Sequence, residues 1–183
     1  MPSASHTYYD LFWNPYGVGG TAVNMASSPA TWRYLLPGPS VASEWVIPDL
    51  ELVMGTLVDY LSNDMALCLC SEKLRDIMEK HRSPEDNLEW LPAKVYDKGK
   101  VHPYFVLHIL EELDVVDTTL SMMDSSGDVL IPVICREKVG DHQVFRYKGA
   151  GMAPRVVCIS NKVRLAIKKA KCVGCALARI AHV

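Results

Sequence analysis

The sequence lacks the features that mark several broad classes of protein. Residues 1–10 carry neither a basic segment nor an apolar stretch of the kind that directs secretion. No run approaches the roughly 18 apolar residues of a membrane span, since the most apolar stretch, 101–113, is interrupted by His102, Pro103, His108, Glu111 and Glu112. We therefore expect a cytoplasmic protein with no membrane partner.

Charge is also nearly balanced. The net charge is −2 and charged residues make up 22% of the chain, so there is no overall basic field of the kind that nucleic-acid binding relies on. One segment, 162–171, is locally basic. Its cationic residues are Lys162, Arg164, Lys168, Lys169 and Lys171. This pattern indicates a compensated surface helix rather than a nucleic-acid probe, and we expect no nucleic-acid partner.

Local catalytic and phosphate-binding motifs are missing as well. The histidines are scattered and form no HExxH pair, and His108 lies in an apolar strand pattern that indicates a satisfied core residue or a flanking one. The glycine-rich stretch Tyr16–Gly20 is not followed by GK[ST] and follows no clear strand, which favours a turn over a phosphate cradle. We expect no enzyme activity and no cofactor.

Cysteine is present in a pattern typical of reduced thiols. The six positions are Cys68, Cys70, Cys135, Cys158, Cys172 and Cys175. Cys172 and Cys175 form a CxxC pair at a helix C-terminus, where the helix dipole raises a thiol pKa rather than lowering it. Cys68 and Cys70 could join them in a metal site only if the two segments lie side by side. Small buried apolar residues are the simpler interpretation, and no metal is expected.

The length of 183 residues and an apolar share of 49% fit one domain spanning 1–183. Residues 1–44 are rich in proline and glycine, which predicts loops and short edge strands. This segment also contains many aromatic residues. They must pack on the domain's own sheet or on a partner, because such a composition is not that of a disordered segment.

Two segments, 67–80 and 156–169, resemble each other. Each is an apolar run followed by a serine, Ser71 or Ser160, and then by apolar residues at helical spacing. A serine in that position is a typical N-cap, whose hydroxyl accepts a backbone N–H of the first turn. The similarity predicts a repeated strand–helix–strand unit, with the first copy at 65–116 and the second at 129–183.

Other elements follow from local patterns. Residues 90–96 and the segment from Val101 to Val116 predict two strands joined at a tip formed by Lys98 and Gly99. Residues 49–60 carry apolar residues at helical spacing, although the stretch 50–53 also fits a strand. Shorter strands are predicted at 129–135, 144–147 and 175–183. The predicted fold class is α+β, with a mixed, mainly antiparallel sheet and a duplicated strand–helix–strand unit.

An ordered series of short motifs within residues 30–180 resembles one known family. The motifs are Trp32-Arg-Tyr34, Ser71-Glu-Lys-Leu74, Trp90-Leu-Pro-Ala-Lys-Val95, Tyr104-Phe-Val-Leu-His-Ile109, Leu113-Asp-Val-Val-Asp117, Val144-Phe-Arg-Tyr147 and Ser160-Asn-Lys-Val163. In this order they are similar to bacterial immunity-protein family eleven, which is found beside polymorphic toxin genes and is common in myxobacteria. Residues 1–30 match less well, and the CxxC pair replaces a plainer turn.

The resemblance implies a non-enzymatic protein that binds and blocks a cognate toxin or effector, encoded by a neighbouring gene. Aromatic anchors with a charged rim would form the contact. The candidate partner-binding residues are Tyr8, Tyr9, Trp13, Tyr16, Glu111, Glu112, Asp114 and Asp117. Internal packing of the aromatic residues and a solvated acidic loop are the alternatives. A regulatory adaptor, or an enzyme with a thiol or metal site, remains open as another function.

Overall fold

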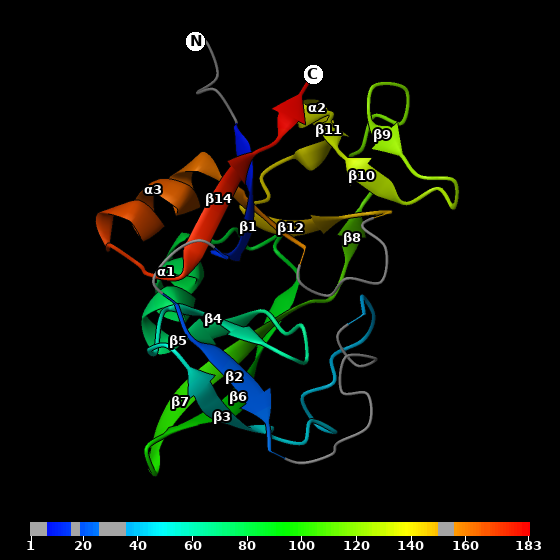
Figure 1. Ribbon diagram of the computed structural model, residues 1–183. Helices are drawn as coiled ribbons and strands as arrows, with labels where there is room; N and C mark the ends of the chain where they lie inside the picture. Colours follow the sequence, from blue (N-terminus) through cyan, green and yellow to red (C-terminus); the bar gives the residue numbers. More distant parts are fainter. Residues whose placement is uncertain (1–6, 16–18, 26–35, 150–155) are drawn as a thin grey trace.

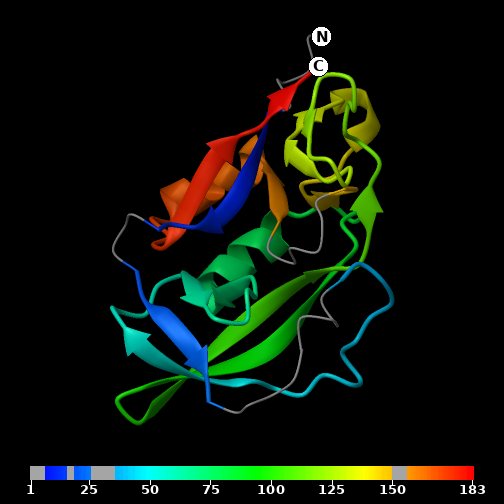
Figure 2. The ribbon, with the colours of Figure 1, turned by 45° about the vertical axis from the view of Figure 1, so that its right-hand side comes forward.

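The computed structural model describes residues 7–15, 19–25, 36–149 and 156–183. Strands dominate, and the protein has an α+β fold. Figure 1 shows two halves, a β-barrel below and an open sheet above, with α1 and α3 next to each other at one side of their junction. The same arrangement is visible in Figure 2 after a turn of the molecule. Strand pairing is mixed and mainly antiparallel, as predicted.

The barrel closes on itself in the order β2-β3-β6-β7-β5-β4. Its strands are β2 (Thr21–Asn24), β3 (Asp49–Met54), β4 (Tyr60–Asn63), β5 (Leu69–Ser71), β6 (Leu88–Asp97) and β7 (Lys100–Ile109). Closure leaves no edge strand within this sheet. Leu50, Leu61, Leu91 and Val106 are fully buried in its interior, because alternate residues of each strand point inward.

The longest strands, β6 and β7, form a continuous hairpin from Leu88↔Ile109 to Asp97↔Lys100. At its tip, Lys98 and Gly99 both have positive φ, 50° and 77°, the geometry that matches the twist of a two-residue hairpin turn. The prediction from the sequence is confirmed here. The return strand ends at Ile109, short of the predicted Val116.

The open sheet has the strand order β14-β1-β13-β12-β8. Its strands are β1 (Tyr8–Trp13), β8 (Glu112–Leu113), β12 (Val144–Tyr147), β13 (Val157–Ser160) and β14 (Cys175–Arg179). Two small sheets flank it, made of β9 (Met122–Met123) with β10 (Val129–Ile131), and of β11 (Val133–Ile134) with β15 (Ala181–His182). The helices are α1 (Glu72–His81), α2 (Arg136–Val139) and α3 (Asn161–Lys169).

The N-terminal strand does not lie at a sheet edge. β1 pairs with β13 on one side and with β14 on the other, so the expectation of edge strands in residues 1–44 is wrong for this segment. Its alternating side chains are sandwiched between two apolar clusters: Leu11 packs with the residues of α3, whereas Tyr8 packs with Phe145 on the opposite face. Burial on both faces accounts for the apolar character of Tyr8 and Leu11 in β1.

The helix considered for residues 49–60 is wrong, and the alternative of a strand near 50–53 is confirmed. β3 pairs with β2 and β6, and these ladder bonds override the helical spacing of the apolar residues. Gly55 then turns the chain with φ 76°, where a Cβ atom would lie 2.0 Å from the carbonyl oxygen of Gly19. The two backbones approach so closely that only glycine fits.

The serine-headed helices begin alike. Ser71 accepts a hydrogen bond from the Leu74 amide at 3.2 Å, and Ser160 accepts one from the Val163 amide at 3.4 Å. Both caps are extended, with φ and ψ of −64° and 162° at Ser71 and of −70° and 164° at Ser160. Both N-cap predictions are confirmed. The strands around the helices belong to different sheets, however, since β5 and β6 lie in the barrel and β13 and β14 in the open sheet.

Candidate functional site

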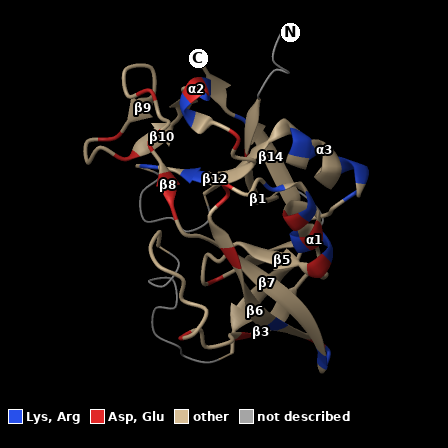
Figure 3. Ribbon diagram, turned by 180° about the vertical axis from the view of Figure 1, so that it is seen from behind, with Lys and Arg blue, Asp and Glu red and all other residues tan. Residues whose placement is uncertain are grey.

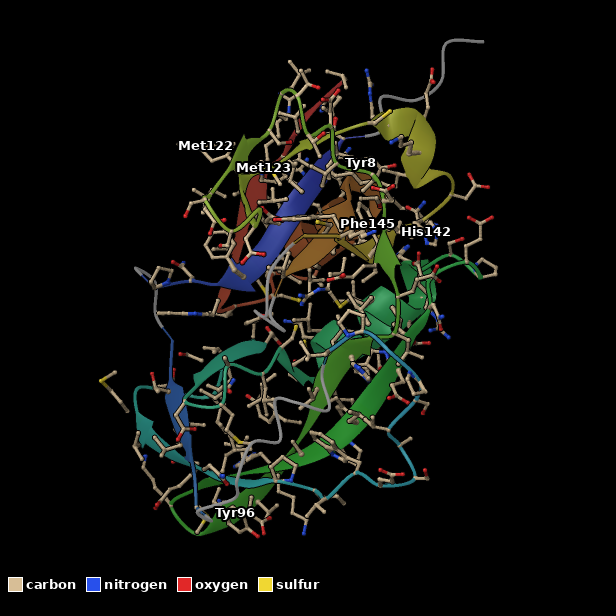
Figure 4. All side chains as sticks on the ribbon, turned by 90° about the vertical axis from the view of Figure 1, so that its right-hand side faces the viewer. Tyr8, Tyr96, Met122, Met123, His142 and Phe145 are labelled. Atoms are coloured by element: carbon tan, nitrogen blue, oxygen red, sulfur yellow. The ribbon has the colours of Figure 1, made fainter. Side chains whose placement is uncertain are left out.

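The aromatic candidates lie in different environments. Tyr8 is buried, and its ring meets that of Phe145 edge-on at 5.4 Å, so it belongs to the core (Figure 4). Tyr9 is half-buried beneath the guanidinium of Arg164, which lies 4.6 Å from the ring centroid. Trp13 is half-buried and lines a pocket described below. Tyr16 lies outside the described residues.

The acidic candidates lie around β8 and the loop that follows it. Glu111 is exposed, whereas Glu112 accepts a 2.6 Å hydrogen bond from Nε of the buried Arg146. Asp114 is exposed. The Asp117 carboxylate accepts the amides of Thr119 and Leu120, at 2.9 and 3.1 Å, and so shapes its own turn. Of this set, Glu111 and Asp114 present exposed side chains, whereas Glu112 and Asp117 are half-buried.

An apolar surface that the sequence analysis missed lies on the β9–β10 hairpin. Three large apolar side chains there, Met122, Leu130 and Ile131, are exposed by more than half, as is Leu120 just before β9. Met122 and Ile131 are paired across the two strands. Figure 4 shows Met122 and Met123 at the periphery of the molecule, on a hairpin that projects from the open-sheet half. Exposed apolar side chains gathered on one element are typical of interaction surfaces.

Two carboxylates lie in the turn of this hairpin. The turn between the strands contains Asp124 and Asp128, and Figure 3 shows acidic segments at β8 and around β9 and β10, with basic segments on α3. The Asp124 carboxylate accepts hydrogen bonds from Ser126 and Asp128, which hold the pKa of Asp124 below its ordinary value of 3.8. The combination is an apolar patch with acidic residues at its turn.

A pocket of about 390 Å³ opens on the open sheet. Its described lining is Asp10, Leu11, Phe12, Trp13, Pro15, Tyr147, Val156 and Val157. β1 supplies half of this lining, and Pro15, the end of β12 and the residues around the start of β13 supply the rest. Most of this described lining is apolar or aromatic, and Asp10 is the one charged residue in it.

The two cysteine pairs, Cys68 with Cys70 and Cys172 with Cys175, lie close together in one apolar cluster. Cys68 and Cys70 have their sulfur atoms 4.0 Å apart, and the thiols of Cys172 and Cys175 also act on Cys70. Within the described ranges, no group of three or more His, Cys, Asp or Glu side chains could hold a metal ion. The nearby Tyr60 hydroxyl is buried, and no described group makes a hydrogen bond to it.

The CxxC segment instead forms a tight junction. Burial, followed by the charge of Asp59, raises the pKa of Cys172 to about 11, with a partly opposing effect of Lys73. Burial likewise raises the pKa of Cys175. The direction agrees with the sequence analysis, but desolvation is the main cause rather than the helix terminus. Neither thiol has the low pKa of a reactive cysteine.

His108 is a core residue, which confirms one of the two roles predicted for it. Its Nδ1 lies 2.7 Å from the Glu89 carboxylate and its Nε2 lies 3.2 Å from the Leu36 carbonyl. Ser40 and the Val41 amide also donate to Glu89. These contacts fasten the loop that contains residues 36–41 to the barrel.

No described helix is long and apolar enough to cross a membrane. A family model described as the immunity protein family (Imm11) matches residues 48–182, which is most of the chain. The chain therefore belongs to this family. No curated protein matches it. The resemblance to this family is confirmed over residues 48–182. The first of the ordered motifs, at 32–34, precedes the matched range and lies outside the described residues.

Proposed function

We propose that this protein neutralises a cognate bacterial toxin by binding it stoichiometrically in the cytoplasm of the cell that produces it. The observation that carries the proposal is its membership of the immunity protein family across residues 48–182. The toxin would be encoded by a neighbouring gene of a polymorphic toxin system. Inhibition would need only occupation of a toxin surface, without turnover of any substrate.

The β9–β10 apolar surface and its acidic surroundings are the proposed contact. Exposed Met122 and Leu130 would be desolvated against an apolar area of the toxin, which is where most binding energy arises in protein interfaces. Glu111 and the nearby carboxylates would steer a basic toxin surface and raise the association rate. Among the candidates from the sequence, Tyr9, Trp13, Glu112, Asp114 and Asp117 are proposed as further contacts.

The proposal is tested by expressing the neighbouring gene with and without this chain. Toxicity that is abolished by co-expression, together with a one-to-one complex in light scattering, supports immunity. A neighbouring gene that is harmless alone contradicts it. A complex formed with a signalling protein, without relief of toxicity, would instead support the regulatory adaptor.

The surface is tested by the double variant Met122→Lys, Leu130→Lys. We expect its affinity for the toxin to fall at least tenfold, because two cations replace apolar contacts. Val53→Lys is the matched control, since Val53 is also 57% exposed but lies on the barrel. Equal affinity of the double variant and the control would show that another surface binds the toxin.

We also propose that the chain is one domain in which 65–116 and 129–183 are copies of one building block. In each, a helix with a serine cap connects two strands that flank a third, antiparallel strand: β5 and β6 flank β7, and β13 and β14 flank β1. A single cooperative unfolding transition, seen alike by tryptophan fluorescence and circular dichroism, would support one domain. Two separate transitions would contradict it.

A further inference from the structure

The pocket on the open sheet contains a carboxylate that the described part of the chain leaves electrostatically uncompensated. Asp10 is half-buried, and the one described hydrogen bond to its carboxylate comes from the Cys158 thiol at 3.5 Å. No described cationic side chain forms an ion pair with Asp10. Burial raises the pKa of this carboxyl, and the thiol contact lowers it only in part.

Aromatic residues share the pocket lining with this carboxylate. The alternation of β1 places Asp10 and Phe12 on the face that also carries Tyr8, and Phe12 is 37% exposed. Trp13 and the buried Tyr147 complete the aromatic part of the lining. Burying a negative charge in such surroundings is unfavourable unless a positive charge or hydrogen-bond donors meet it.

We propose that this pocket receives one basic side chain, a lysine or an arginine, from the toxin. The aliphatic stem of that side chain would pack on Val156 and the aromatic rings, while its cation pairs with Asp10 and interacts with ring faces. The volume of about 390 Å³ is sufficient for a single side chain. The charge of the pocket selects a cation over an apolar residue of similar length.

This inference rests on the proposed function, because the toxin supplies the side chain. It adds an anchoring position to the β9–β10 apolar surface, which lies in the same half of the molecule (Figure 1). The complementary partner would combine a protruding basic residue with a surface of positive charge. Both features are electrostatically matched to this chain's acidic groups.

The pocket can be tested without the toxin. N-acetyl-arginine amide and N-acetyl-lysine amide are titrated into the full chain, with N-acetyl-citrulline amide as the uncharged analogue of arginine. We expect saturable amide shifts centred on Asp10, Phe12 and Tyr147 for the cationic probes, and at least tenfold weaker binding of the citrulline probe. Equal binding of the charged and uncharged probes, or no saturable shift with either cationic probe, overturns the inference.

Variants test whether Asp10 and Phe12 themselves bind the cationic probe. Asp10→Asn keeps the shape of the side chain and should weaken arginine-amide binding at least tenfold, whereas the control Asp76→Asn, on the exposed face of α1, should leave it unchanged. If Asp10→Asn does not fold, Phe12→Ala tests the aromatic wall and should weaken binding by severalfold. Unchanged binding in a folded Asp10 variant overturns the inference.

The toxin complex separates this inference from the proposed function. Asp10→Asn should weaken that complex at least tenfold while the wild type protects cells. If the wild type protects and the variant binds toxin equally well, the occupant of the pocket is not a toxin residue and the inference fails alone. If the wild type does not protect, the proposed function fails, and with it the assignment of the occupant to a toxin.

Discussion

The Asp59 carboxylate accepts a hydrogen bond from the backbone amide of Val173 at 2.8 Å, joining two residues 114 positions apart in the chain. The same carboxylate accepts the Ser71 hydroxyl at 2.7 Å and the Lys73 ammonium at 3.3 Å. The barrel, the start of α1 and the turn after α3 therefore meet at one side chain. Asp86 makes a comparable junction beyond α1 by accepting the amides of Gln143 and Val144, at 2.9 and 3.1 Å.

We expect Asp59→Asn to destabilise the protein by about 2–3 kcal/mol, because an amide nitrogen would face donors and leave one of them unpaired in a buried place. Urea unfolding followed by fluorescence measures the loss. Asp76→Asn is the control, since the Asp76 side chain is 60% exposed, and its effect should stay within about 0.5 kcal/mol. Similar effects of the two variants would show that the Asp59 junction contributes little.

Gly174 in the CxxC turn should not tolerate a side chain. Its φ is 82°, and a Cβ atom would lie 2.4 Å from the Tyr60 carbonyl oxygen. We expect Gly174→Ala to lower the free energy of unfolding by about 2–5 kcal/mol, because the methyl group adds both backbone strain and overpacking. The control Gly99→Ala has a φ of 77° but open space around it, so only about 1–2 kcal/mol is expected. If urea unfolding shows equal losses of stability for the two variants, the residues around Gly174 move to accommodate the methyl group.

Cys172 should be slow to alkylate in the native protein. With a pKa of about 11, about one thousandth of this thiol is ionised at pH 8, against roughly a quarter of a thiol with the ordinary pKa of about 8.5. We expect iodoacetamide to label it about 100-fold more slowly than in urea, as measured by peptide mass spectrometry. Rapid native labelling would support the alternative of a thiol enzyme.

Stability should depend on Glu89 in a defined pH range. Burial alone would raise the pKa of Glu89, but hydrogen bonds from Ser40, His108 and Val41 outweigh it and lower the pKa below 4.5. Since the folded-state value is the lower one, ionised Glu89 stabilises the fold above its unfolded pKa. This contribution is lost as the pH falls through the folded pKa.

The difference in unfolding free energy between wild type and Glu89→Gln should therefore be largest near neutral pH and should shrink below about pH 4.5. Urea titrations across this range provide the measurement. Glu72→Gln is the control, because the Glu72 side chain is 63% exposed, and its difference should remain small throughout. A difference for Glu89→Gln that stays constant with pH would assign its effect to packing instead of charge.

Elements governed by neighbouring residues could be predicted from the sequence. The hairpin at Lys98 and Gly99 and the caps at Ser71 and Ser160 depend on contacts within a few positions, and all three were found. The strand at residues 49–54 was left as an alternative to a helix because its ladder partners come from distant segments. The same reason placed β1 inside a sheet rather than at an edge.

The candidate site, too, could be predicted from the sequence only in part. Residue types identified the acidic stretch and the aromatic N-terminal segment, but burial decides which of their side chains can meet a partner. Tyr8 packs on Phe145, and Glu112 pairs with Arg146, because other parts of the chain cover them. The exposure of Met122 and Leu130 could not be inferred, since apolar residues beside a turn are usually covered by the core.

By itself, the sequence determined the family, the α+β class and the starts of both long helices, because these depend on residue order and short-range hydrogen bonds. The tertiary structure alone decided the closed barrel, the interior place of β1, the role of the CxxC turn as a junction, and the surfaces left open to solvent. Each of these features depends on which segments, far apart in the sequence, pack together and exclude water.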